Sequence, residues 1–520
     1  MAYTNSSLCT PASFSPTLYG ASILNISATL VTGYSTTASE KYNYNHPTIP
    51  VVNATFCNVT VTYTHPGQND KINVEAWLPP KETYNGRMQA TGGGGWVAGR
   101  FYLSYLDMAG AIAEGYATMT TDAGLGYDSD PTNWAEISEG NVNLYTLQNF
   151  GSVSLYEETV MMKGLINDYY GAPPTYSYWS GCSQGGRQGL MLAQRYPGLY
   201  DGIAASAPGN NWNEFIPSIY YPQMIMNLLG VYPRACELDF IAAEATKACD
   251  GLDGVVDGLV SDMDACHFDP FSLVGSSFNC SATGMNMTLT EGAAIISNVS
   301  WTGSQTANGS FIWYGHNPGS AISGTGVPYS VAATTCFANG TCVGNPTPLG
   351  TQWIQLFVEK NPNYNFSNMT HQDFDDIYHY SKQIFDDIYS ASDPDLTRFR
   401  DAGGKMLSYH GMLDEIIPPS GTEHYYKAVT ELTPDVHDFY RFYKVPGLQH
   451  CSGGTGGQPT AIWAALTAWV ENGTVPDALP ISFANNNNGT TNRKLCPFPQ
   501  KAVYDGSGDP DSAASFNCVA

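Results

Sequence analysis

The sequence predicts an α/β fold, a mostly parallel sheet with helices on both faces, interrupted by one large inserted domain. Strand-like and helix-like segments alternate from residue 72 to 207 and again from 404 to 471, as in strand–helix–strand units. Between 210 and 397 the alternation stops, and this segment holds six cysteines and many glycines, serines and asparagines. We therefore assign residues 1–209 and 398–520 to the α/β core and 210–397 to an inserted lid.

Local patterns predict the core elements in order. Segments 59–64 and 72–78 alternate apolar and polar residues with a period of two, which predicts a hairpin. Segment 153–169 has helical periodicity and ends before Gly171. Segment 202–207 is a strand that ends at Pro208. The other predicted strands are 87–90, 116–120, 176–179, 404–410 and 440–445, and the other helices are 105–115, 422–432 and 461–471.

Composition limits the partners. The chain has 520 residues and a net charge of −25, which repels nucleic acid and anionic membranes, so neither is an expected partner. No apolar run reaches the length of about 18 residues that a membrane span needs. The twelve cysteines lack zinc-ligand spacing, which favours disulfides and an oxidising compartment. We expect Cys9–Cys57 to tie an exposed N-terminal cap, residues 1–70, and Cys496–Cys518 to staple the tail.

Glycosylation sequons are dense, which is typical of a secreted glycoprotein. The opening residues Met1-Ala2-Tyr3-Thr4 lead straight into polar sequence without a signal peptide, so a mature form with an added start is expected. The sequons include Asn25, Asn53, Asn58, Asn286, Asn298, Asn308, Asn339, Asn365, Asn368, Asn472 and Asn488.

A strand–turn–helix motif centres on Ser183. Gly181, Ser183 and Gly185 form Gly-x-Ser-x-Gly between the aromatic strand 176–179 and an apolar-periodic segment that stops at Pro197. A serine on so tight a turn has strained dihedral angles, and flanking glycines remove the clashes. The following helix points its N–H groups at the serine, which suits a developing oxyanion. The alternative is a chance Gly/Ser loop, but the flanking pattern favours a nucleophile elbow.

A glycine run, Gly92–Gly95, follows the strand at 87–90. It lacks the Gly-Lys-Ser/Thr ending of a P-loop and the spacing of a dinucleotide fingerprint. Hydrolases with a nucleophile elbow take a second oxyanion N–H from a loop that precedes the serine in this way. We interpret the run as that loop, with a plain turn as the alternative.

Ser183, Asp414 and His450 lie at the ends of three predicted strands, in the serine–acid–histidine order of α/β-hydrolases. Ser183 would be the nucleophile, His450 its general base and Asp414 the group that orients the imidazole. His410 is also near Asp414, but it precedes the aspartate and so fails the chain order. The alternatives are a turn aspartate and a solvated loop histidine.

Cys182 precedes Ser183 directly, and Cys451 follows His450 directly. Because a triad brings serine and histidine together, the neighbouring cysteines would be close enough to bridge. We hypothesise a Cys182–Cys451 disulfide. The alternative is that each cysteine pairs elsewhere.

The segment 249–259 interleaves three aspartates with glycines. Hard oxygen ligands at this spacing, with backbone carbonyls between them, suit Ca²⁺, although no glutamate occupies the twelfth position of an EF-hand. An acidic turn is the alternative.

Together, the Gly-Cys-Ser-x-Gly-Gly-Arg elbow, the Asp, the His-Cys pair and the acidic loop resemble the fungal tannase and feruloyl esterase family, which also includes a bacterial plastic-monoester hydrolase. The resemblance runs from Cys9 to Cys518. It implies an α/β-hydrolase core, a large lid, the Cys182–Cys451 bridge and structural Ca²⁺, with no organic cofactor. The residues it implies are Asp250, Asp253, Asp257 and the carbonyls of Val255 and Leu259 for Ca²⁺, and the N–H groups of Gln184 and Gly94 for the oxyanion.

The resemblance further implies a secreted serine carboxylic-ester hydrolase that acts on phenolic esters through an acyl-enzyme. Some fungal tannases carry a dibasic processing site in the lid, and no Lys-Arg pair occurs between 210 and 397, which favours a feruloyl esterase releasing ferulic and related hydroxycinnamic acids from plant cell walls. The alternatives are a tannase acting on galloyl esters, an inactive hydrolase fold used for binding, and a peptidase, which the triad alone would permit.

Overall fold

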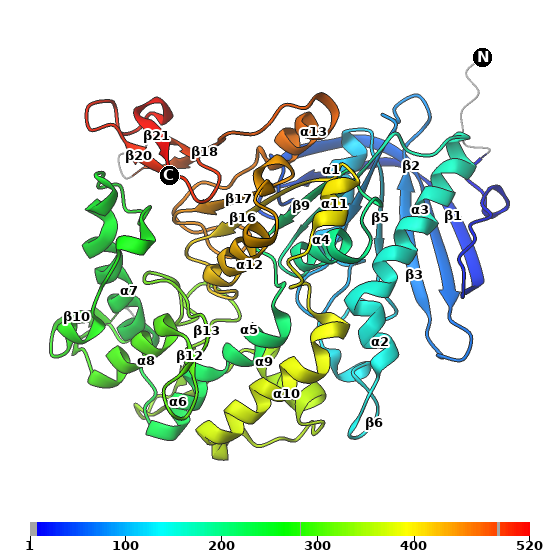
Figure 1. Ribbon diagram of the computed structural model, residues 1–520. Helices are drawn as coiled ribbons and strands as arrows, with labels where there is room; N and C mark the ends of the chain where they lie inside the picture. Colours follow the sequence, from blue (N-terminus) through cyan, green and yellow to red (C-terminus); the bar gives the residue numbers. More distant parts are fainter. Residues whose placement is uncertain (1–7, 281, 486–488) are drawn as a thin grey trace.

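The computed structural model describes residues 8–280, 282–485 and 489–520, so the sequon at Asn488 lies outside the described residues. One large sheet organises the chain, in the strand order β1-β2-β3-β5-β4-β8-β9-β16-β17 (Figure 1). The pairs from β5 to β17 are all parallel, whereas β1, β2, β3 and β5 pair antiparallel. The strands are β1 (Ser22–Ala38), β2 (Ile49–Thr64), β3 (Ile72–Leu78), β4 (Arg87–Thr91), β5 (Ala117–Thr121), β8 (Tyr176–Cys182), β9 (Gly202–Ser206), β16 (Lys405–Gly411) and β17 (Tyr440–Val445).

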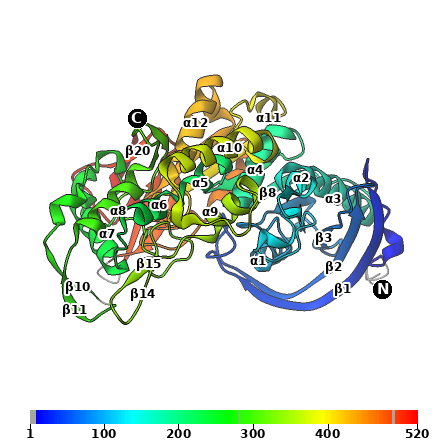
Figure 2. The same ribbon diagram turned by 90° about the horizontal axis from the view of Figure 1, so that it is seen from below.

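Helices cover both faces of the sheet, which confirms the predicted α/β-hydrolase core. On one face, buried side chains of α3, α4 and α12 pack on the strands together with Phe399 of α11. On the other face, Trp463 and Leu466 of α13 pack on β16 and β17, and α1 lies against β2 and β3 in the concave side of the long bent strands β1 and β2 (Figure 2). The helices are α1 (Tyr102–Ala113), α3 (Ser154–Tyr170), α4 (Gln184–Arg195), α11 (Thr397–Asp401), α12 (Pro419–Leu432) and α13 (Ile462–Asn472).

The N-terminal region differs from the expected cap. The 59–64 and 72–78 hairpin forms, but β2 already begins at Ile49, and β1 pairs with it along most of its length. Strand β1 buries only Ala38 fully, because most of its residues are small and polar. Strands β1 and β2 therefore extend the sheet at an exposed edge, and the Cys9–Cys57 disulfide anchors the segment that precedes β1 to β2.

Residues 210–397 leave the sheet after β9 and return to it just before β16 (Figure 1). Their apolar side chains share one core cluster with Trp96, in the turn after β4, and with Phe150, in the helical stretch between α2 and α3. The segment contains α5 (Trp212–Ser218), α6 (Tyr221–Leu229), α7 (Ala235–Cys249), α8 (Glu291–Thr302), α9 (Pro348–Gln352), α10 (His371–Tyr389) and the hairpins β10–β11 (Ser277–Cys280, Met285–Thr288), β12–β13 (Ser304–Gln305, Phe311–Trp313) and β14–β15 (Thr334–Cys336, Cys342–Gly344).

Smaller elements complete the chain. A short hairpin, β6–β7 (Glu136–Ser138, Asn141–Val142), leads into α2 (Leu144–Gln148). The tail forms two hairpins, β18–β19 (Leu479–Ala484, Thr490–Leu495) and β20–β21 (Lys501–Tyr504, Phe516–Val519), which the Cys496–Cys518 disulfide joins. Within the described residues, no helix is long and apolar enough to cross a membrane.

Candidate active site

Ser183 lies between the end of β8 and the start of α4, and its backbone has φ +63°. For a residue other than glycine this left-handed conformation is strained and needs support from its surroundings. The Ser183 N–H donates to Ser206 O at 3.0 Å, and the Gly209 N–H donates to Ser183 O at 3.2 Å. A Cβ on Gly181 would lie 2.5 Å from the Gly185 backbone, so the turn closes only because glycine stands there. The predicted nucleophile elbow is present.

Arg187 is the last residue of the elbow motif Gly-Cys-Ser-x-Gly-Gly-Arg, and its contacts explain why an arginine stands there. Its guanidinium is fully buried and donates to the carbonyls of Phe150, Gly151 and Tyr389 at 2.9 to 3.0 Å. The same group stacks over the Tyr389 ring at 4.2 Å. Its Nε donates to Gln184 Oε1 at 2.9 Å, so three backbone carbonyls, one side-chain carbonyl and a ring face satisfy this buried cation without a carboxylate. Arg187 thereby ties the elbow helix to the inserted segment at the end of α10.

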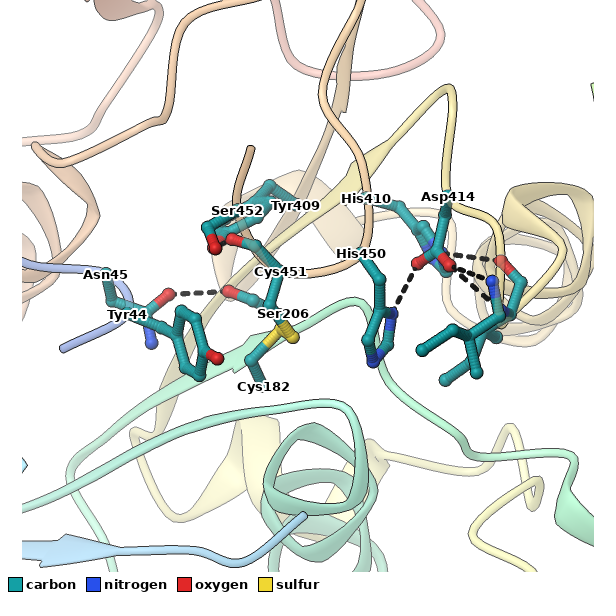
Figure 3. Close-up of a disulfide and its surroundings, with 12 residues drawn as sticks. Tyr44, Asn45, Cys182, Ser206, Tyr409, His410, Asp414, His450, Cys451 and Ser452 are labelled. Atoms are coloured by element: carbon teal, nitrogen blue, oxygen red, sulfur yellow. Dashed lines mark hydrogen bonds and ion pairs between the residues drawn. A yellow bond between two sulfur atoms is a disulfide. The ribbon is translucent and has the colours of Figure 1, made fainter. Parts of the chain in front are cut away.

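Asp414 and His450 form the acid–base pair that the chain order predicts. His450 Nδ1 lies 2.7 Å from Asp414 Oδ2 (Figure 3). Asp414 is fully buried; burial raises its pKa, but the neighbouring histidines outweigh this and hold the pKa well below its ordinary value. Burial lowers the pKa of His450, but the charge of Asp414 outweighs it and leaves the pKa raised. The aspartate is therefore ionised and the imidazole basic.

A disulfide joins Cys182 to Cys451 with a Cα–Cα distance of 6.0 Å, which confirms the hypothesised bridge (Figure 3). Ser183 and His450 are the immediate neighbours of the two half-cystines, so the bridge fixes the start of both side chains. Cys451 also has a left-handed backbone, with φ +59°. Its carbonyl accepts a hydrogen bond from the Tyr409 hydroxyl at 2.9 Å.

Two residues of the N-terminal region, Tyr44 and Asn45, support this disulfide, and no sequence pattern indicated that they would. Tyr44 packs against the cystine. The Asn45 side chain accepts from Ser206 Oγ at 2.5 Å (Figure 3) and donates to Ser180 Oγ at 3.1 Å. Asn45 is fully buried and has φ +72°, a conformation that asparagine tolerates. It thus bridges the ends of β8 and β9 beneath the cystine.

The glycine run lies against the elbow, as predicted, because Gly93 O accepts the Gly185 N–H at 3.1 Å. The choice of Gly94 as a donor is not supported. Its N–H donates to Val97 O at 3.1 Å in a tight turn, so it is already used. Within the described residues, Gln184 and the two central residues of that turn, Gly95 and Trp96, have N–H groups without an acceptor.

The sequence model described as "Tannase and feruloyl esterase" matches residues 57–519. The chain belongs to the tannase and feruloyl esterase family. Both activities in the family's name hydrolyse carboxylic esters, so this member is a carboxylic-ester hydrolase.

Individual proteins similar to this chain carry the names of the same two activities. A probable feruloyl esterase of Arthroderma benhamiae is 38% identical over 482 residues, covering 91% of this chain and 87% of its own length. The tannase of Aspergillus oryzae is 28% identical over 534 residues, covering 93% and 88%.

Solved structures give the same picture. The tannin acyl hydrolase of Aspergillus niger superposes with a TM-score of 0.89 at 27% identity, covering 100% of this chain and 96% of its own. Feruloyl esterase B of Aspergillus oryzae superposes with a TM-score of 0.79 at 26% identity, covering 99% and 100%.

The acidic loop of this family member holds its three aspartates close together. Burial raises the pKa of Asp253, and the charges of Asp257 and Asp250 add to the effect. Asp250 Oδ1 accepts two peptide N–H groups at 3.0 Å, and Asp257 Oδ2 pairs with Arg493 at 2.6 Å. Within the described residues, no three His, Cys, Asp or Glu side chains converge on one point. The donor chemistry suits Ca²⁺, but the carboxylates are arranged as a hydrogen-bonded loop, so the calcium site stays a prediction.

Two further side chains contact the acid–base pair. Glu415 Oε2 accepts the His450 peptide N–H at 3.1 Å, and burial together with the Asp414 charge raises the pKa of Glu415 to about 6. His410 Nε2 lies 2.9 Å from Asp414 Oδ2. Chain order excluded His410 as the base, but it did not address a supporting role. In the sequence, only the closeness of Glu415 and His410 to Asp414 indicated that these two residues contact the acid–base pair.

Proposed function

We propose that this chain is a secreted feruloyl esterase that releases ferulic and related hydroxycinnamic acids from plant cell-wall esters. The observation that carries the proposal is the Asp414–His450 hydrogen bond, held by a disulfide next to a serine on a strained elbow. The family relative at 38% identity, named a probable feruloyl esterase, supports the acyl group.

In the proposed reaction, Ser183 Oγ attacks the ester carbonyl while His450 Nε2 takes its proton. Asp414 accepts from Nδ1 throughout and stabilises the imidazolium. The Gln184 N–H and one N–H of the turn at Gly95 and Trp96 would bind the oxyanion. His450 then protonates the departing alkoxide, and a water activated by the same imidazole hydrolyses the acyl-enzyme to release the phenolic acid.

Replacing Ser183 tests this mechanism. Ser183→Ala should lower kcat on methyl ferulate by at least about 10³-fold, because no other group can form the acyl-enzyme. Ser272→Ala, at an exposed position in the short 3-10 helix Pro270–Leu273, is the matched control and should leave the rate unchanged. Turnover by a folded Ser183→Ala protein would remove Ser183 from the reaction.

A tannase acting on galloyl esters is the second candidate, favoured by the TM-score of 0.89 to the Aspergillus niger tannin acyl hydrolase. The two differ in the acyl group, since a hydroxycinnamate carries a propenoyl spacer that a gallate lacks. Comparing kcat/KM on methyl ferulate, methyl caffeate and methyl gallate decides between them. Preference for the gallate would overturn the feruloyl esterase proposal while leaving the triad intact.

The inserted segment 210–397 is proposed to act as the lid that shapes the acyl pocket. Trp96, which follows the glycine run, packs on Trp212 and Trp353 of this segment with ring centroids 5.1 and 6.1 Å apart. These contacts couple the lid to the oxyanion loop. A Trp212→Ala variant should therefore change the preference among the three esters, whereas a uniform loss would indicate a structural role alone.

Calcium binding by residues 250–259 is also proposed, with Asp250, Asp253, Asp257 and the carbonyls of Val255 and Leu259 as ligands. The charges of Asp250 and Asp257 raise the pKa of Asp253, and this supports the proposal because a bound cation would offset that repulsion. The protein should unfold at a lower temperature with EDTA than without it, and added Ca²⁺ should restore the original unfolding temperature. Asp253→Asn should abolish this response, and an EDTA-insensitive wild type would refute the proposal.

Secretion and N-glycosylation are supported by the six disulfides and by the sequon asparagines. Every predicted sequon asparagine in the described residues is at least partly exposed. Deglycosylation of protein secreted by a fungal host should reduce its mass. Unchanged mass would refute glycosylation.

A further inference from the structure

The carboxylate of Asp414 receives four hydrogen bonds, two on each oxygen. Oδ1 accepts the peptide N–H groups of Ile416 and Ile417 at 2.9 and 2.8 Å. Oδ2 faces His450 Nδ1 at 2.7 Å and His410 Nε2 at 2.9 Å (Figure 3). The mechanism proposed above accounts for His450 only. The second histidine on the same oxygen therefore needs a function of its own.

The neighbours of His410 determine which of its nitrogens carries a proton. Nε2 faces two acceptors, Asp414 Oδ2 and, at 3.1 Å, the carbonyl of Ile417. An unprotonated Nε2 would set its lone pair against the Asp414 carboxylate and leave the Ile417 carbonyl without this donor in a fully buried site, so Nε2 carries the proton. Nδ1 lies 2.8 Å from the Thr422 hydroxyl of α12, which can donate to it and hold this tautomer.

We propose that His410 is a positioning residue for ester hydrolysis: its Nε2–H is a permanent second donor to Asp414 Oδ2, which keeps that oxygen aimed at His450. This inference rests on the proposed function. Because the two histidines share one oxygen, the His410 donor also draws charge away from the His450 hydrogen bond. It therefore limits how strongly Asp414 raises the proton affinity of His450.

Other titratable groups around this pair are few within the described residues. His316, from the inserted segment, is buried, and burial lowers its pKa to about 4, so it is neutral at neutral pH. The Tyr409 hydroxyl has a pKa raised by burial and stays protonated. Glu415 accepts from the His450 peptide N–H and is the remaining acid. None of these donates a hydrogen bond to Asp414, so none replaces His410.

Two substitutions at His410 separate the donor from the imidazole ring. His410→Leu removes the donor, whereas in His410→Gln the amide nitrogen stands close to the position of Nε2. We expect His410→Leu to lower kcat on methyl ferulate at least about tenfold with KM nearly unchanged, because the aspartate is less well fixed. We also expect the acidic limb of its kcat/KM profile to move up by about 0.5 pH unit, since Asp414 then binds the imidazolium more tightly. His410→Gln should bring both kcat and the position of the acidic limb back towards their wild-type values.

A milder variant covers the case in which His410→Leu fails to fold. Thr422→Val removes the hydroxyl that holds the tautomer but keeps the ring, and it should shift the limb in the same direction by a smaller amount. Thr430→Val is its matched control, because Thr430 lies on the same helix and its hydroxyl donates to the Tyr426 carbonyl, away from the acid–base pair. A limb that stays in place or moves down in His410→Leu, or a Gln variant as impaired as the Leu variant, would overturn the proposal. Ser183→Ala tests the proposed function separately, because it removes turnover and leaves the His410 contacts intact.

Discussion

Removing the Cys182–Cys451 disulfide is the most informative perturbation of the site. In Cys182→Ala/Cys451→Ala the elbow and the His450 loop lose their only covalent connection close to the site. Ser183 and Cys451 both have left-handed backbones, at φ +63° and +59°, and such conformations persist only where the surroundings enforce them. We therefore expect His450 to move relative to Ser183 although the sheet stays folded. A displacement of about 1 Å between reacting groups costs about 100-fold in rate.

The stability effect can be worked out from the length of chain that the bridge closes. The two cysteines are 269 residues apart, which corresponds to about 5.6 kcal/mol of loop entropy in the unfolded chain. Three further disulfides lie inside this loop and already shorten it, so this value is an upper bound. The Cys496–Cys518 bridge closes 22 residues, or about 3.4 kcal/mol. The two double-alanine variants should thus differ by at most about 2 kcal/mol in unfolding free energy.

Initial rates on methyl ferulate and thermal unfolding, measured on both variants, test the reasoning. We expect the variant without Cys182–Cys451 to lose about 100-fold in kcat with little change in KM. The variant without Cys496–Cys518 should keep wild-type kcat while unfolding at a lower temperature. Wild-type kcat in the first variant, or equal activity losses in both, would show that the clamp does not position the reacting groups.

Three other measurements follow from the structure. Glu415→Gln keeps an acceptor for the His450 peptide N–H but removes a charge that raises the pKa of His450, so the acidic limb of the kcat/KM profile should move down by about 0.5 pH unit. Glu431→Gln, on the exposed face of α12, is the control and should leave the limb unchanged. An upward shift in the Glu415 variant would contradict the reasoning. Burial raises the pKa of Asp107 to about 8, so the folded state holds a proton that the unfolded state loses near pH 4, and stability falls by about 1.4 kcal/mol per pH unit between those values. Asp107→Asn should remove this fall when unfolding is followed by urea titration from pH 5 to 8, and parallel curves for wild type and variant would refute it. In Gly93→Ala a Cβ would lie 1.9 Å from Val97 O, so kcat should drop with the oxyanion turn displaced, and an unchanged rate would exclude the turn from the site.

Local sequence patterns predicted most of the core accurately. The last strand of the large sheet, β17, has the predicted bounds of 440–445, and the strand before Ser183 begins at residue 176 as predicted, although it continues to Cys182. The helix after Ser183 ends before Pro197, as predicted. These segments have strong periodicity, and glycine or proline marks their ends. The N-terminal strand β1 was missed because its Thr- and Ser-rich sequence buries little and shows no apolar alternation. Its formation depends on pairing with β2, which a local pattern does not contain.

The residues adjacent in sequence to a motif could be predicted, and the residues that reach the site from elsewhere could not. Cys182 and Cys451 each adjoin a triad residue, so the expected geometry of the triad was enough to predict that the two cysteines lie close together. Tyr44 and Asn45 have no such neighbour, and only the folded sheet carries them to the cystine. The choice of Gly94 failed for a related reason, because the hydrogen bonding within a run of four glycines depends on the turn it forms, and that turn uses the Gly94 N–H for Val97.

The position of His450 shows why so many contacts are needed at this site. The loop after β17 has no regular structure around His450, so its position must be set by individual contacts. Those contacts all lead to the ends of parallel strands: Cys451 to Cys182 after β8, the Cys451 carbonyl to Tyr409 of β16, and the ring and peptide of His450 to Asp414 and Glu415 directly after β16. The disulfide is covalent, the Tyr409 hydrogen bond joins two neutral groups, and the contacts to Asp414 and Glu415 involve carboxylates. The sheet therefore fixes the histidine through bonds that respond differently to reductant and to pH, and this difference allows positioning and electrostatics to be measured separately in the same loop.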